Sequence, residues 1–423
     1  MKKKIDQKNP IEIMSPVGSY EALHAAIKAG ANSIYFGVAN LNMRSGSSKN
    51  FDLEDLKKIV KICIKNNVKS YLTLNTIMYD KDLVLMKKII DTAKLSKITA
   101  LIISDISAMM YAKEKKVEIH ISTQANVSNF DAVKFYSQFA DVIVLARELT
   151  LQQVKNIVTL IKKENVCGPN GNLIQIELFA HGAMCVAISG KCHMSLATYN
   201  SSANRGKCLQ NCRRKYKVTD VQTGNELAIN NNYVMSPKDM CTINFIDKII
   251  ETGTIVLKLE GRGRSPEYVY TVTKCYREAV DSYYSKTYSK EKIKSWLNEL
   301  KSVYNRGFWN GYYHGKTIDT WSNTFGTKAT KEKKYVGKCQ NYFKKNKIAQ
   351  FILEAGKIKK NDEIIITGTT TGVIKSKIKK LFVNDVESDS ANKGDVITIP
   401  ISELVRENDL LYVYNKKLKK NSI

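Results

Sequence analysis

Short apolar runs alternate with amphipathic helical patterns along the first two-thirds of the chain. Each of the first seven runs is followed by a polar turn and a helical pattern, and an eighth run precedes a longer helical stretch at 267–284. The runs cover residues 12–15, 33–37, 71–75, 100–104, 118–122, 142–146, 175–180 and 255–259. Eight alternating strand and helix units predict an α/β fold, a (β/α)8 barrel of the TIM type rather than an open sheet.

The pattern changes after about residue 285. A helical pattern at 290–303 carries apolar residues at helical spacing, and the stretch at 317–334 is rich in Thr, Ser and Lys, which is typical of a linker. Strand-like runs separated by turn signals follow at 349–353, 363–367, 373–377, 395–399 and 410–414. We therefore predict three parts, which are a barrel domain at 1–285, a helical connector and linker at 286–332, and a small β-barrel at 333–423.

The barrel pattern breaks between the seventh and eighth predicted strands, at about 183–233. This predicted insertion contains four of the nine cysteines, which are Cys185, Cys192, Cys208 and Cys212. Thiolates bind soft metals, and four of them match both structural zinc and a cubane iron–sulfur cluster. Cysteines four residues apart share a helical face, whereas the first pair is seven apart, which is wide for a single tetrahedral ion. The spacing favours an iron–sulfur cluster over zinc, buried free thiols or disulfides.

The same segment is strongly basic. Its cations crowd the cysteines, and they are Arg205, Lys207, Arg213, Arg214, Lys215 and Lys217. They could offset the negative charge of a cluster or hold phosphate groups, and the two roles are compatible.

Polar side chains follow the predicted strands at the end where a barrel of this type carries its active site. The candidates from this position are Gln124, Asn126, Arg147, Glu148, His181, Glu260 and Arg262. Arginine forks suit carboxylates or phosphates. Strand ends are also where polar loops begin, and a lone histidine is as readily structural as catalytic. A group that combines two arginines, two glutamates and a histidine is harder to explain in that way.

The composition is basic, with 67 Lys and Arg against 40 Asp and Glu and a formal net charge of +27. Such a charge is typical of proteins that bind polyanions such as RNA. A lysine- and asparagine-rich chain encoded by an AT-rich genome would show the same bias, so charge alone favours nucleic acid only weakly. The basic N-terminus has no apolar stretch behind it before Glu12, and no span has the apolar length of a membrane helix. We therefore expect a cytoplasmic protein with no membrane partner.

Several separated motifs resemble the signature of the peptidase U32 family. The main one is Glu-Leu-Phe-Ala-His-Gly-Ala-Met-Cys-Val-Ala-Ile-Ser-Gly-Lys-Cys-His-Met-Ser at 177–195, followed by Cys-Leu-Gln-Asn-Cys-Arg-Arg at 208–214. Matching segments occur in the same order at 14–18, 29–37, 122–126, 147–149, 236–239 and 258–262. The similarity covers nearly the whole chain, including the C-terminal part.

Within that family the sequence most resembles the branch that makes 5-hydroxyuridine at the wobble position of tRNA. The resemblance implies a prephenate-dependent, oxygen-independent hydroxylation at C5 of uridine, with the base extruded into the barrel mouth. It implies a [4Fe-4S] cluster on Cys185, Cys192, Cys208 and Cys212, and as partners prephenate and the anticodon region of tRNA, in a homo- or hetero-oligomer.

The roles of the site residues are expectations from the same resemblance. We expect Arg147, Arg262 or Arg44 to hold the two carboxylates of prephenate, and Glu148, Glu260 and His181 to transfer protons. Gln124, Asn126 and Lys258 are the further substrate-binding candidates, beside Arg44.

Other functions stay open on the sequence. Sister branches hydroxylate ribosomal RNA or quinone precursors, and the family name implies a collagenase-like peptidase. The chain shows no nucleophile elbow, no zincin helix and no evident Ser or Cys paired with a base, which disfavours the peptidase. A noncatalytic RNA-binding iron–sulfur protein would not need the polar group at the barrel mouth.

Overall fold

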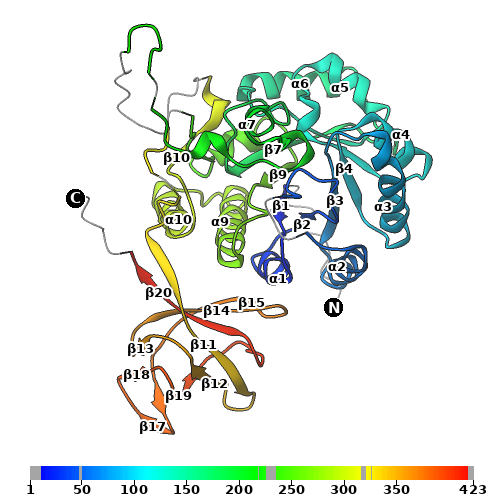
Figure 1. Cartoon of the computed structure of the whole chain (residues 1–423). Helices are drawn as coiled ribbons and strands as arrows, with labels where there is room; N and C mark the ends of the chain where they lie inside the picture. The colour runs from blue at the N-terminus through cyan, green and yellow to red at the C-terminus, as the bar shows by residue number, and fades with distance from the viewer. Residues whose placement is uncertain are drawn as a thin grey trace.

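A closed parallel barrel forms the first part of the molecule (Figure 1). The computed structural model describes residues 11–46, 50–217, 219–224, 235–315, 321–324 and 326–417. The barrel strands are β1 (Glu12–Pro16), β2 (Ser33–Phe36), β3 (Lys69–Leu74), β4 (Ala100–Ile103), β5 (Ile119–Ile121), β6 (Val142–Val144), β7 (Gln175–Gly182) and β9 (Val256–Leu259). Neighbours pair in parallel, and β9 pairs with both β7 and β1, which closes the barrel. The predicted (β/α)8 barrel is confirmed, with its eighth strand where the sequence placed it.

Helices cover the outside of the barrel. They are α1 (Tyr20–Lys28), α2 (Leu53–Lys65), α3 (Leu83–Leu95), α4 (Ile106–Glu114), α5 (Phe130–Ser137), α6 (Leu151–Lys163), α8 (Ile246–Ile250) and α9 (Pro266–Tyr284). In α2, a capping box at Asp52 starts the helix, and Leu56, Ile59 and Cys63 form its buried face. None of the described helices has the length and apolar composition needed to cross a membrane.

The segment between β7 and β9 leaves the barrel and folds over one end of it. It contains α7 (Met194–Tyr199), the 3₁₀ turns Ala203–Arg205 and Asn211–Arg213, and β8 (Asp239–Cys241), which is antiparallel to β7. The amide of Gly46 donates to Gly206 (3.0 Å), and Arg205 forms an ion pair with Asp82 (2.5 Å). These contacts attach the segment to the loops that follow β2 and β3. Residues 218 and 225–234 of the predicted insertion lie outside the described residues.

The C-terminal part is an antiparallel β structure that follows α10 (Lys290–Ser302) and β10 (Phe308–Trp309). Its strands are β11 (Lys331–Phe343), β12 (Ile348–Leu353), β13 (Lys357–Lys359), β14 (Glu363–Gly368), β15 (Gly372–Lys377), β16 (Phe382–Val383), β17 (Val386–Glu387), β18 (Ser390–Asn392), β19 (Val396–Pro400) and β20 (Leu410–Lys416). The order of the main sheet is β15-β14-β20-β11-β12-β19-β16-β17, and β13 pairs with β18. A second core around Phe351, Ile366, Ile397 and Leu411 supports it. The predicted all-β C-terminal part is confirmed.

The C-terminal sheet docks on the helices α1, α9 and α10, beside which it lies in Figure 1. Ala25, Ile365, Val373 and Tyr414 form a small buried apolar cluster at this contact. The Tyr414 hydroxyl donates to the backbone oxygen of Ser302 (2.8 Å), which ties β20 to the end of α10.

We expect Gly372→Ala to weaken this docking. Gly372 has φ +69°, and a Cβ there would lie 2.8 Å from the backbone nitrogen of Ala25 in α1. We expect a loss of about 2–4 kcal/mol in the free energy of unfolding, from backbone strain plus the clash, measured by urea denaturation. Gly356→Ala is the matched control, because its φ is +66° but the nearest atom to its Cβ is 3.7 Å away. Equal losses in both variants would contradict the proposed clash.

Candidate active site

A cavity of about 240 Å³ lies at the carboxyl ends of the barrel strands, under the inserted segment. Its lining comes from the barrel strands, the loop after β2, the insertion, and Arg306 just before β10. The predicted residues that line it are Arg44, Gln124, Arg147, Lys258, Glu260, Arg262 and the four clustered cysteines. The fold therefore brings together most of the residues singled out from the sequence, although they are spread over more than two hundred positions.

All four cysteines of the insertion face this cavity. Cys185 is exposed, and Cys192, Cys208 and Cys212 are partly buried. The pKa of the Cys212 thiol is raised to about 11, mainly by burial, with Arg213 lowering it and the charges of the other three cysteines raising it. The four sulfurs are thus close enough to interact electrostatically, and a bound cation would relieve their repulsion.

The spacing of these thiols bears on the kind of metal group that they fit. Within the described part of the chain, no three or more Cys, His, Asp or Glu side chains are grouped so that they could hold a metal ion. A tetrahedral zinc ion, with bonds of about 2.3 Å to sulfur, draws its four sulfurs to within about 4 Å of one another. A cubane cluster distributes its thiolates over several irons, so that its ligands stand further apart. Four cysteine thiols around one cavity supply the donor type and the number of ligands that such a cluster requires.

Glu260 forms the centre of the polar lining. Its carboxylate is paired with the Arg44 guanidinium, and within the described part of the chain its second, buried oxygen has no hydrogen-bond partner. Burial alone would raise the pKa of Glu260, but the charges of Arg44, Arg147 and Arg264 lower it to about 2. Glu260 is therefore an ionised carboxylate in this surrounding and a poor proton donor at neutral pH.

The Arg147 guanidinium lies over the ring of Phe179, with 3.7 Å between the guanidinium carbon and the ring centre. Its Nη1 donates to the backbone oxygen of Ala183 (3.0 Å), and its buried Nε has no hydrogen-bond partner among the residues that the structure describes. Burial lowers the pKa of this side chain. A planar guanidinium that is held by stacking and keeps an unused donor is well placed to bind an anionic ligand.

Arg262 is bound differently from the other predicted arginines. It is 4% exposed, its Nη1 donates to Thr73 Oγ1 (2.6 Å), and its Nη2 donates to the side-chain oxygen of Asn42. Burial lowers its pKa to about 10. Its terminal nitrogens are thus already bonded within the protein, so its contacts fit a residue that positions the loop after β2.

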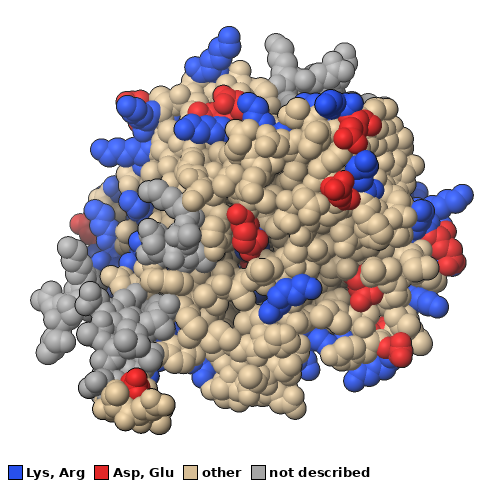
Figure 2. Space-filling view, turned by 90° about the horizontal axis from the view of Figure 1, so that it is seen from above, with Lys and Arg blue, Asp and Glu red and all other residues tan. Residues whose placement is uncertain are grey.

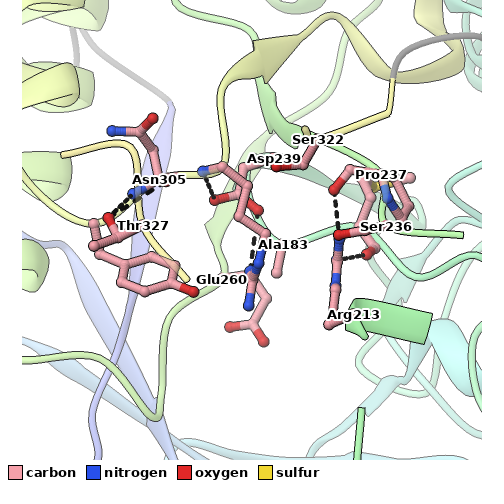
Figure 3. Close-up of polar contacts among 12 residues, drawn as sticks. Ala183, Arg213, Ser236, Pro237, Asp239, Glu260, Asn305, Ser322 and Thr327 are labelled. Atoms are coloured by element: carbon pink, nitrogen blue, oxygen red, sulfur yellow. Dashed lines mark hydrogen bonds and ion pairs between the residues drawn. The ribbon is translucent and has the colours of Figure 1, made fainter. Parts of the chain in front are cut away.

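Three further arginines line the cavity beside the predicted ones. Arg213 donates to Ser236 Oγ (3.0 Å) and to the backbone oxygen of Pro237 (2.5 Å), as Figure 3 shows. Arg306 pairs with Asp239 (3.4 Å), and Arg264 stacks on a tyrosine ring. Of these three, Arg213 is among the basic residues expected beside the cysteines, whereas Arg264 and Arg306 were not predicted. The sequence Gly-Arg-Gly-Arg at 261–264 was a usable signal for Arg264, whereas only tertiary folding brings Arg306 to the cavity.

His181 does not face the cavity. It is 1% exposed, its Nδ1 lies 3.3 Å from the Tyr276 hydroxyl, and its ring packs against Tyr268 and Phe308. Burial lowers its pKa to about 3, so the imidazole is neutral. The register of β7 against β9 shifts between Phe179 and His181, and the side chain therefore points into the packing behind the cavity. The expectation that His181 transfers protons in the site is not supported by this position.

Of three other candidates, only one lines the cavity. Glu148 is exposed and lies outside the cavity lining. Asn126, with φ 55°, donates to the backbone oxygens of Gln124 (3.1 Å) and Ser189 (3.4 Å) and so connects the loop after β5 to the insertion. Gln124 accepts a hydrogen bond from Asn75 (3.0 Å) and does line the cavity.

The cavity is strongly electropositive apart from its thiols. Glu260 is the one acidic side chain among its described lining residues, which include Lys258 and six arginines. Such a lining suits an anionic ligand or a negatively charged metal cluster. The fold and site together define a TIM-type barrel protein with a cysteine-bearing insertion over a basic cavity.

Comparison with known proteins identifies the family. The model of "Peptidase family U32" matches residues 18–323, and the chain belongs to this family. A protein of Porphyromonas gingivalis (strain ATCC BAA-308 / W83) named "Collagenase" is 53% identical over 409 residues, which cover 97% of this chain and 99% of that protein. The tRNA hydroxylation protein P1 of Bacillus subtilis (strain 168) is 31% identical over 374 residues, which cover 86% and 85% of the two chains.

A third relative is the 23S rRNA 5-hydroxycytidine C2501 synthase of Escherichia coli (strain K12). It is 32% identical over 273 residues, which cover 64% of this chain and 39% of that protein. The family resemblance predicted from the motifs is thus confirmed, and the relatives include proteins named for RNA hydroxylation as well as proteins named for peptidase activity.

Proposed function

We propose that this protein is an RNA hydroxylase that converts wobble uridine of tRNA to 5-hydroxyuridine, with a [4Fe-4S] cluster and with prephenate as co-substrate. The observation that supports the proposal is one cavity that combines four cysteine thiols with a cluster of arginines. Relatives named as tRNA hydroxylation proteins align with most of the chain. Cleavage of a peptide does not require four thiols and a cluster of arginines in one cavity.

The cluster would be held by Cys185, Cys192, Cys208 and Cys212. When bound, it would supply one-electron redox chemistry at the wall of the cavity. Arg213 contributes fixed positive charge beside these ligands, because its guanidinium is hydrogen-bonded to the backbone oxygens of Met184 (2.5 Å) and Pro237 (2.5 Å). The resulting field would favour a cluster of net negative charge.

The carboxylates of the co-substrate would bind to Arg147 and Arg44. Among the described residues the Arg147 Nε has no hydrogen-bond partner, and the Arg44 side chain is 36% exposed while paired with Glu260. A ligand carboxylate could accept hydrogen bonds from Arg147 and share the positive charge of Arg44 with Glu260. In this arrangement Glu260 holds the Arg44 side chain in place before the ligand arrives.

The RNA would present a single extruded base. A cavity of about 240 Å³ has room for a small molecule or one base and not for a folded stem. Seen from above, Lys and Arg side chains lie mostly around the rim of the molecule, and the centre of this face is largely uncharged (Figure 2). With a net charge of +27, phosphate contacts around the molecule would add affinity that falls steeply with salt.

Peptidase activity is the second candidate, because a relative that is 53% identical is named "Collagenase". The described cavity lining contains no histidine, whose imidazole activates the nucleophile in many peptidases. Hydroxylation of ribosomal RNA is a variant of the first proposal, favoured by the relative that acts on 23S rRNA.

The nucleosides of cellular RNA test these candidates directly. In a strain that lacks the gene, we expect 5-hydroxyuridine and its derivatives to disappear from tRNA, and prephenate starvation to mimic the deletion. Digestion and mass spectrometry of both tRNA and 23S rRNA measure the outcome, with complementation by the wild-type gene as control. Loss of a hydroxylated base from rRNA alone would move the substrate to the ribosome. Unchanged RNA together with peptide cleavage by the purified holoprotein would establish the peptidase.

A further inference from the structure

A layer of ionisable side chains crosses the barrel interior below the cavity. The alternate strands β1, β3, β5 and β7 contribute Glu12, Tyr71, His120 and Glu177, and each of these residues is at most 8% exposed. Layers of this kind in TIM barrels are dominated by branched apolar residues. Because buried charges cost several kcal/mol of desolvation each, packing alone gives no reason for a charged layer.

One side of this layer forms a line of ionisable groups that leads from the cavity to solvent. Lys258, which lines the cavity floor next to the Tyr35 ring, donates from Nζ to Glu177 Oε1 (2.7 Å). The other oxygen of Glu177 lies 3.5 Å from His120 Nδ1. His120 Nε2 lies 3.5 Å from a carboxylate oxygen of Glu118, whose side chain is 34% exposed just before β5. The line therefore emerges at the end of the barrel opposite the cavity.

The contact between Glu177 and His120, in the middle of this line, is too long for a good hydrogen bond. His120 Nδ1 and Glu177 Oε2 are both buried, and neither has a hydrogen-bond partner within the described residues. Their separation of 3.5 Å is at the outer limit of a hydrogen bond, and a small rotation of either side chain would close it. An unpaired buried polar atom costs about 1–3 kcal/mol, so a purely structural network would be expected to close this gap.

The charges around His120 allow it to gain and lose a proton. Burial lowers its pKa, but the carboxylates of Glu118 and Glu177 outweigh burial and raise it. Burial likewise raises the pKa of Glu177, and the charges of Lys258 and His120 outweigh burial and lower it. The other ionisable groups that face the imidazole are Tyr71, whose ring centre is 4.5 Å away, Glu12 behind the Tyr71 hydroxyl (2.8 Å), and Asp141 at the start of β6.

We propose that Lys258, Glu177, His120 and Glu118 form a proton path through the barrel, with Lys258 as the acid–base group at the cavity. In the resting ion pair the Lys258 ammonium passes a proton to Glu177, which passes it to His120 Nδ1, and the neutral Lys258 amine that remains takes a proton from the cavity. The His120 imidazolium then releases the proton on Nε2 through Glu118 to water. One proton crosses per cycle and all four groups regain their starting charges, and the imidazole regains its starting tautomer when the ring turns over. The link to turnover rests on the proposed function, because hydroxylation at C5 requires the hydrogen on that carbon to leave the base.

Kinetics of His120→Gln test the path. Glutamine retains polar contacts but cannot carry the proton. We expect the turnover number to fall at least tenfold with little change in KM, and the titration of the His120 imidazole to disappear from the pH profile of turnover. Glu12→Gln is the matched control, because Glu12 lies in the same layer but contacts Lys69 and Tyr71 instead of the path. A folded His120→Gln holoprotein with an unchanged rate and pH profile would show that the layer is only structural.

A second measurement does not depend on RNA chemistry. The chain has five histidines, so holoprotein labelled with ¹³C at histidine Cε1 gives few resonances, and His120→Gln assigns the one that matters. We expect the His120 signal to titrate, and its midpoint to move to higher pH in Lys258→Met, because removal of the cation leaves the Glu177 charge less compensated. Absence of titration in the folded protein would overturn the path. Titration in a protein that leaves RNA unmodified would instead overturn the proposed function.

Discussion

Cys212→Ala is expected to yield a colourless protein without iron and without RNA hydroxylation in cells. The wild-type protein, purified without oxygen, should be brown and contain about four irons and four sulfides per chain, as a cubane on four thiolates requires. Cys212 faces the cavity together with Cys185, Cys192 and Cys208, so removal of one thiolate leaves three ligands and opens one corner of the cluster to solvent. Iron and sulfide analysis, visible absorption and the nucleoside profile of a complemented deletion strain measure the effect.

Two other cysteines provide controls for this variant. Cys339 is buried in the C-terminal sheet, and Cys167 lies in the connection before β7, so neither contributes to the cavity lining. We expect Cys339→Ala to lower stability slightly and Cys167→Ala to be neutral, with full iron content in both. A wild-type protein that is colourless and binds stoichiometric zinc would refute the cluster.

The regular part of the fold was predictable because its strands are buried. Apolar runs such as 100–104 coincide with β4, whose residues are all buried, and periodic apolar positions predicted α2. The elements that were missed are short or exposed. β8 and β10 have three and two residues, and β11, a strand of 13 residues that begins at Lys331, carries four lysines, none of which is buried. The predicted linker at 317–334 therefore overlaps the start of β11.

The site residues were predictable where their position at the end of a barrel strand determines that the side chain faces the cavity. Site residues that depend on strand register or on contacts with distant loops were harder to predict. Arg147, Glu260 and Arg262 follow strands of the barrel and line the cavity, as the rule for strand ends anticipates. His181 breaks the rule, because β7 continues to Gly182 with a register shift that the sequence pattern does not reveal. The partners of Arg262, Asn42 and Thr73, come from distant loops and strands, so its internal bonding could not be foreseen.

Arg147→Ala is expected to lower kcat/KM by about 100-fold or more while the iron content stays unchanged. Truncation of one partner in a buried, hydrogen-bonded charge pair costs about 2–5 kcal/mol, and 2.7 kcal/mol corresponds to about 100-fold. Arg147 stacks on Phe179 with an unused donor, so its loss should act mainly on binding of the carboxylate-bearing co-substrate. Arg147→Lys should recover little, because an ammonium neither stacks as a plane nor binds bidentately.

The comparison variant for Arg147 is Arg214→Ala. Arg214 also belongs to the basic insertion, but it is exposed, packs against the Tyr199 ring and lies outside the cavity lining. Isothermal titration calorimetry of each purified holoprotein with prephenate measures binding of the co-substrate separately from the chemical step. We expect the dissociation constant to rise at least tenfold in Arg147→Ala and to stay unchanged in Arg214→Ala. Equal affinities in Arg147→Ala and the wild-type protein would mean that the co-substrate binds elsewhere, and that Arg147 only fixes the backbone of Ala183 beneath the insertion.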